Sequence, residues 1–131
     1  MLQGCEGWRC GDNRVQLLGT AGDLADESRR MHHCVGVYAD AARRGSSFFF
    51  HGDLAGSSVT IQLRASAGSM VIVQASGYAN RVLIPSETKV LGTWLTDLNE
   101  VLGSRCDGTW PKLRGRFTGA FRFAIECLGV E

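Results

Sequence analysis

The most informative absences in this 131-residue chain concern membranes and secretion. No stretch approaches the roughly 20 consecutive apolar residues that a membrane-spanning helix needs. The opening residues, MLQGCEGWRCGDNR, contain no uninterrupted apolar core, so we expect no signal peptide. Internal repeats and low-complexity tracts are lacking as well. These absences predict a cytoplasmic protein whose residues 1–131 form a single domain, without a membrane partner.

The signatures of several common catalytic and metal centres are also missing. The chain has no P-loop, no GxGxxG fingerprint and no paired-acid nuclease motif. Its five cysteines are an odd number for a secreted disulfide framework, which favours reduced thiols. Cys5, Cys10, His32, His33 and Cys34 are candidate zinc ligands, but neither a CxxC knuckle nor an HxxxH pair is present. We therefore expect no bound metal and no cofactor.

The residues that are present predict an α+β fold that begins with two short helices. Thr20 and Asp23 form a capping box that opens the first helix. The second is expected over about 34–44 and is ended by Gly45. Residues 14–19 are a strand candidate, whereas the first dozen residues, which are rich in glycine and cysteine, are expected to be irregular.

An antiparallel meander and a covering helix are expected next. Three strands, or more, are indicated at 46–51, 58–65 and 69–76, separated by turns rich in glycine and serine. Alternation in the second strand predicts one buried and one polar face, with Thr60 and Gln62 on the polar face. The sequence predicts an amphipathic helix over 86–102 that covers the sheet. Its apolar stripe comprises Val90, Leu91, Trp94, Leu95, Leu98, Val101 and Leu102.

Cys34 is the thiol whose position suggests chemistry. At a helix start, free N–H groups and the helix dipole favour a thiolate. A cysteine there, followed by β-hairpins, is the general layout of papain-like cysteine hydrolases, in which the sheet supplies a histidine. His51 would be that histidine, with Gln74, Asn80 or Asp53 to orient it. The alternative is that Cys34 is a buried cysteine beside capping histidines. His33 and Cys34 are adjacent in sequence, and adjacent residues on a helix do not face each other, so a His33–Cys34 pair would need a non-helical turn.

The charge of the chain is uneven, although its net value is only +1. Five cations stand in the segment 104–122, interleaved with Trp110, Phe117 and Phe121. The cations are Arg105, Lys112, Arg114, Arg116 and Arg122. This mixture supports phosphate contact together with base stacking, whereas an exposed charged face is the alternative explanation.

Several short motifs along the chain resemble the PcfJ-like family, whose members are encoded on conjugative plasmids, phages and other mobile elements. The resemblance covers about 20–95 and leaves 104–131 as a basic C-terminal segment. The family pattern has an acidic residue, a Met/Leu-x-His-Cys-Val-Gly-x-Tyr block, Gly-x-Ser before a strand, Thr-x-Glu, and Gln-x-x-Gly-x-x-Asn. It is met by Glu27, Met31, His33, Cys34, Val35, Gly36, Tyr38, Gly45, Ser47, Thr60, Gln74, Gly77 and Asn80. Gln62 departs from it, because the family tends to have Glu there, and His51 has no counterpart in it.

The resemblance implies that polar residues from separate elements belong to one constellation. These are His33, Cys34, Tyr38, Thr60, Gln74 and Asn80. They would form either a polar pocket or a buried hydrogen-bond network that fixes the fold.

In the pocket reading, Cys34 is the nucleophile of an enzyme or part of a ligand site. His33 or His51 is the base, and Gln74 and Asn80 are orienting or oxyanion groups. Tyr38 and Thr60 are further candidates. The other reading is a non-catalytic phage or plasmid protein that binds a host protein, a defence factor, a nucleoprotein complex or nucleic acid through residues 105–122.

Overall fold

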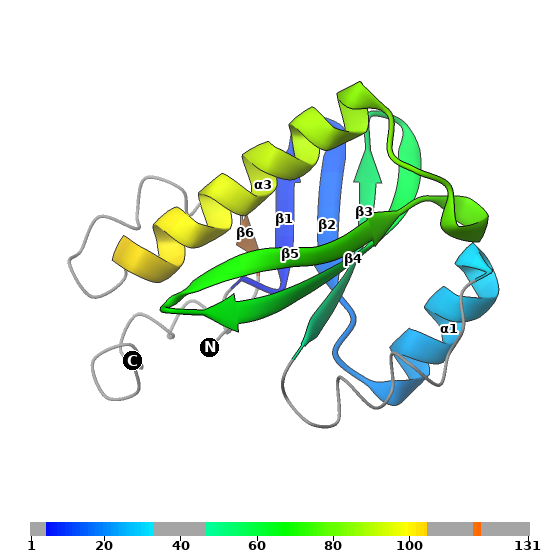
Figure 1. Cartoon of the computed structure of the whole chain (residues 1–131), viewed down its shortest axis with the longest axis horizontal. Helices are drawn as coiled ribbons and strands as arrows, with labels where there is room; N and C mark the ends of the chain where they lie inside the picture. Colours follow the sequence, from blue (N-terminus) through cyan, green and yellow to red (C-terminus); the bar gives the residue numbers. More distant parts are fainter. Residues whose placement is uncertain (1–4, 33–46, 105–116, 119–131) are drawn as a thin grey trace.

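The computed structural model describes residues 5–32, 47–104 and 117–118. In these ranges the strands are β1 (Gly7–Cys10), β2 (Asn13–Leu17), β3 (Phe48–Leu54), β4 (Ser57–Ser66), β5 (Ser69–Ser76) and β6 (Phe117–Thr118). The helices are α1 (Ala21–Met31) and α3 (Pro85–Ser104), and a short 3₁₀ helix, η1 (Tyr78–Asn80), lies between β5 and α3. The expected α+β class is therefore confirmed (Figure 1).

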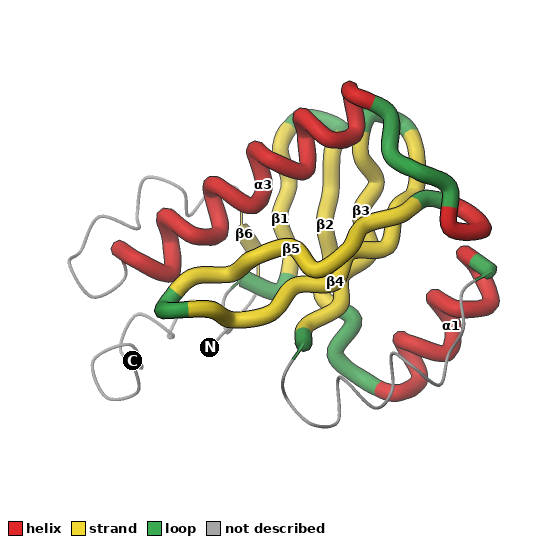
Figure 2. The backbone as a smooth tube through the Cα atoms, in the orientation of Figure 1, coloured by secondary structure: helices red, strands yellow, loops and turns green. Residues whose placement is uncertain are grey.

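The strands form one antiparallel sheet in the order β5-β4-β3-β2-β1-β6 (Figure 2). The meander of β3, β4 and β5 matches the expectation, but β2, β1 and β6 extend it to six strands. The expectation of irregular structure in the first dozen residues is wrong. Trp8 of β1 pairs with Val15 of β2, and both are buried, so this hairpin is held by packing that the glycine-rich composition conceals.

Helix α1 has the N-terminus that the capping box predicts. The Thr20 hydroxyl accepts a hydrogen bond from the Asp23 backbone N–H, and the Asp23 carboxylate accepts one from the Thr20 N–H. The helix ends at His32, which has a left-handed backbone with φ of 57°. The expectation that the fold begins with two short helices is wrong, because the β1–β2 hairpin precedes α1. The second predicted helix, 34–44, lies outside the described residues.

Two tight turns join the three strands of the meander and determine where each strand ends. Ala55-Gly56 and Ala67-Gly68 all have positive φ, as a two-residue type I′ hairpin turn requires. The first turn is therefore shorter than the sequence suggests, and β3 continues through Asp53 to Leu54.

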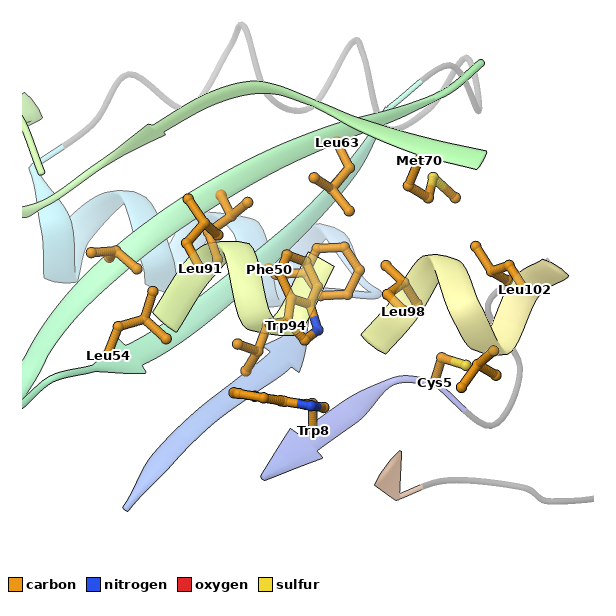
Figure 3. Packing of buried hydrophobic residues seen from close by; sticks show 14 residues of the cluster. Cys5, Trp8, Phe50, Leu54, Leu63, Met70, Leu91, Trp94, Leu98 and Leu102 are labelled. Atoms are coloured by element: carbon orange, nitrogen blue, oxygen red, sulfur yellow. The ribbon is translucent and has the colours of Figure 1, made fainter. Parts of the chain in front are cut away.

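Helix α3 covers one face of the sheet and forms the main core with it (Figure 3). The predicted stripe is confirmed: Leu91, Trp94 and Leu98 are buried against sheet residues such as Phe50. Phe50 and Trp94 meet edge to face, with ring centroids 4.8 Å apart. The helix starts before its expected first residue, at Pro85. No helix in the described ranges is long and apolar enough to cross a membrane.

Helix α1 contacts the opposite face of the sheet. Leu24 packs with Phe49 and Leu18 in a small second cluster. Thr60, which was expected on a polar face, is only 4% exposed because α1 lies over it. This covered polar face is where the candidate site lies.

Candidate functional site

The strand register arranges polar side chains on this face in two neighbouring rows. Directly opposite residues of antiparallel strands project to the same side of a sheet. The first row runs Arg9, Arg14, Asp53, Ser58 across four strands. The second row runs Gln16, His51, Thr60, Ser76. A third pair, Gln62 and Gln74, follows on β4 and β5, so Gln74 shares a face with Thr60 and Gln62.

A buried carboxylate from α1 reaches the second row. Glu27 is 1% exposed, and both of its oxygens lie within hydrogen-bond distance of Nδ1 of His51, at 2.9 and 2.8 Å. The Thr60 hydroxyl donates to Oε2 of Glu27 at 2.5 Å. An ionised carboxylate only accepts hydrogen bonds, so Glu27 keeps a proton on Nδ1 and fixes the orientation of the ring.

The other ring nitrogen faces the solvent-exposed end of the network. Nε2 of His51 lies 3.3 Å from Oδ1 of Asp53, which also accepts a hydrogen bond from the Ser58 hydroxyl at 3.1 Å. The His51 side chain is 12% exposed and the Asp53 side chain 47%. Nε2 therefore lies towards the half-exposed Asp53, whereas Nδ1 lies towards the buried Glu27.

The charges around His51 favour its protonated form. Burial of the ring lowers its pKa, but the hydrogen bond and charge of Glu27, together with the charge of Asp53, raise it more. Arg30 opposes them through its positive charge. The net result is a His51 pKa above the ordinary value of 6.5, so the ring is an imidazolium flanked by two carboxylates in mildly acidic solution.

Most of the residues that the sequence nominates lie outside the described ranges. This applies to His33, Cys34 and Tyr38, and to the cations Arg105, Lys112, Arg114, Arg116 and Arg122. The remaining candidates are described. His51 and Thr60 meet at Glu27, whereas Gln74 is exposed on β5, an edge strand of the sheet.

Gly77 and Asn80, from the same motif as Gln74, shape the backbone after β5. A Cβ at position 77 would lie 2.5 Å from the Arg81 guanidinium, so only glycine admits this close approach. Asn80 is exposed and has φ of 64°, a left-handed conformation that asparagine tolerates well. Arg81 forms two hydrogen bonds with the fully buried Glu87, at 3.0 and 2.7 Å.

Sequence reasoning missed the partner of His51. In the sequence, Glu27 stands out only as the acidic residue of a family pattern, and Gln74, Asn80 or Asp53 is expected to orient His51. One signal was available: a glutamate three residues after Leu24 and four before Met31 lies on the buried face of its helix. A carboxylate at such a position needs a buried partner.

The described part of the chain contains no group of three or more His, Cys, Asp or Glu residues arranged to hold a metal ion. The described candidate zinc ligands are in different places. Cys5 lies in the core under α3 and Cys10 packs against that core. His32, at the end of α1, instead contacts Tyr78 of η1, with the rings tilted by 52° and their centroids 4.7 Å apart. Figure 1 shows η1 and the end of α1 together, away from β1.

Comparison of the chain with protein-family models, with curated proteins and with solved structures finds no match. The resemblance to the PcfJ-like family stays a prediction from short motifs.

Proposed function

We propose that this chain is a cysteine-dependent enzyme in which Glu27 orients His51 and His51 exchanges a proton with the Cys34 thiol. The observation that carries the proposal is the buried carboxylate on Nδ1, which leaves Nε2, 3.3 Å from the half-exposed Asp53, as the nitrogen available for proton exchange with a thiol. A carboxylate, an imidazole and a nucleophile in this order are the parts of a hydrolytic triad. A histidine pKa above its ordinary value also suits a resting pair of thiolate and imidazolium.

The roles of the other residues follow from this chemistry. The thiolate of Cys34 attacks an acyl carbon, and imidazolium His51 then gives its Nε2 proton to the leaving group. Gln74 and Asn80 carry amide groups that would stabilise an oxyanion. The role of Cys34 in this proposal rests on the sequence alone, and so does that of His33, the alternative base.

The rate at which iodoacetamide alkylates Cys34, measured from pH 4 to 9 by peptide mass spectrometry, tests the pairing. We expect a midpoint well below the usual thiol pKa of about 8.5. The His51→Asn variant should move that midpoint towards the usual value, because the stabilising imidazolium is gone. His32→Asn, a matched histidine variant, should leave it unchanged. An ordinary midpoint in the unmodified chain, or identical profiles for all three proteins, would refute the pairing.

A mobile-element origin and a cytoplasmic location form part of the same proposal, and they rest on the motifs that resemble the PcfJ-like family. The genomic neighbourhood tests the origin: genes of conjugation or of phage assembly beside this one support it, and a housekeeping operon contradicts it.

The second candidate is a non-catalytic interaction protein that binds nucleic acid through 105–122. Its support is the spacing of cations and aromatic residues. It predicts salt-dependent nucleic-acid binding that survives Cys34→Ala and is lost when Arg114 and Arg116 are neutralised.

A further inference from the structure

The first polar row ends in two arginines, of which only Arg14 has a carboxylate, that of Asp53, opposite it on a neighbouring strand. Arg9 and Arg14 pair directly across β1 and β2, and both are exposed. Like charges placed opposite each other on neighbouring strands destabilise a sheet. Neither guanidinium forms an ion pair with a carboxylate in the described ranges of the chain. An anion bound between the two guanidinium groups would offset this repulsion.

The surface around the two arginines is hollowed. An open hollow of about 390 Å³ is lined by Arg9, Gly11, Asp12 and Arg14. Gly11 is the first of the two turn residues and has φ of 62°, as a type II′ hairpin turn requires. Asp12 is the single acid of the lining, so the hollow keeps a net positive charge.

We propose that Arg9 and Arg14 form a binding site for a phosphate-class oxyanion. Two guanidinium groups present paired N–H donors in the geometry that phosphate oxygens accept. A dianion also removes the repulsion between the two arginines, which a neutral ligand cannot do. The tight turn holds both side chains on one face, so little of the binding free energy is lost in ordering the backbone.

This site adjoins the row that contains His51. Arg14 lies opposite Asp53, and His51 is the next residue of β3 on the same face. Diagonal neighbours of an antiparallel pair are about 7–8 Å apart, within reach of a long side chain. If His51 transfers protons as proposed above, its substrate is an anionic, phosphate-bearing molecule anchored on the arginines. This last step rests on the proposed function, whereas the anion site itself does not.

Titration of the ¹⁵N-labelled full chain with inorganic phosphate, at constant ionic strength maintained with chloride, tests the site. We expect saturable shifts of the Gly11 and Arg14 amide signals. Arg9→Gln and Arg14→Gln should each weaken binding at least tenfold. Arg64→Gln, which removes an exposed arginine from β4 of the same sheet, should change it less than twofold. Asp12→Asn should tighten binding, because it removes the one negative charge of the hollow.

Linear shifts without saturation would overturn the proposal, as would equal binding by the Arg14→Gln and Arg64→Gln variants. The dispersion of the amide signals shows in each case whether the variant is folded. His51→Asn separates the two proposals. Phosphate binding within twofold of the unmodified chain assigns the anion to the arginines, even if the proton-transfer role fails. A tenfold loss in that variant would mean that the imidazolium holds the anion, and the arginine site would be wrong.

Discussion

At the scale of single residues, Glu27 decides what His51 can do. A buried carboxylate must be paired, and Glu27 is satisfied by the imidazole and by the Thr60 hydroxyl. The pair brings together residues 24 positions apart in the sequence. Removing one member of a buried ion pair costs about 3–5 kcal/mol, because the other charge is left without a partner. The pair therefore contributes to folding as well as to the proposed chemistry.

The pKa of His51 is the direct measure of this arrangement. In an NMR titration of the imidazole, we expect a pKa above 6.5 in the unmodified chain. Glu27→Gln should lower it, because the hydrogen bond to a charged acceptor is lost while burial remains. Asp26→Asn, a variant at the exposed neighbouring position of α1, should leave it unchanged. The same His51 pKa in Glu27→Gln and in the unmodified chain would contradict the pairing of Glu27 with His51.

The same shift makes stability depend on pH. The folded-state pKa of His51 lies above its unfolded value, so the network contributes fully below about pH 6.5. The contribution is lost as the pH rises through the folded-state pKa. The free energy of unfolding should fall over this window in the unmodified chain, and less so in His51→Gln.

At the scale of elements, the connection from β5 to α3 is held by an ion pair that depends on a glycine. Gly77 lies against the guanidinium of Arg81, whose nitrogens bind the buried Glu87 in the first turn of α3. The hydrogen bonds from Arg81 lower the pKa of Glu87, although burial opposes them. Because this pKa is lowered from 4.5, the pair stabilises the fold at neutral pH and loses its effect as acid protonates Glu87.

Two glycine-to-alanine substitutions should have opposite effects on stability. Gly77→Ala should destabilise by about 1–3 kcal/mol, because Arg81 can yield only by leaving a buried carboxylate. Gly92→Ala, on the exposed side of α3 with nothing within 4 Å of a new Cβ, should stabilise by about 1 kcal/mol. Urea unfolding at pH 7 measures both, and the effect of Gly77→Ala should shrink at pH 3. Equal effects of the two substitutions on the free energy of unfolding would show that the close approach of Arg81 to Gly77 does not contribute to stability.

At the scale of the whole molecule, α3 joins the strands into one unit. Its buried face packs against residues of β1 to β5, and the Trp8 indole N–H donates to Asp97 of α3 at 2.9 Å. Asn99 of α3 also forms two hydrogen bonds with the Met70 backbone, which fixes the β4–β5 hairpin against the helix. The site thus lies on the face of the sheet opposite to the one that packs against α3.

The dependence of the fold on this packing can be measured at Leu98, which is fully buried. Leu98→Ala should destabilise by about 2–5 kcal/mol, through lost burial and the cavity that remains. Ile72→Ala, at a position 38% exposed on β5, should cost much less. Urea unfolding followed by circular dichroism should show one cooperative transition in both variants. Comparable losses in the two variants would contradict the role of α3.

The sequence by itself determined the features that depend on neighbours close along the chain. The Thr20 capping box, the turn between β4 and β5 and the apolar stripe of α3 each follow from spacings of a few residues. The tertiary structure alone decided that Glu27 meets His51 and that Arg9, Arg14 and Asp53 form one row. These pairings depend on strand register and on how α1 lies across the sheet, and both are set by contacts between residues far apart in the sequence.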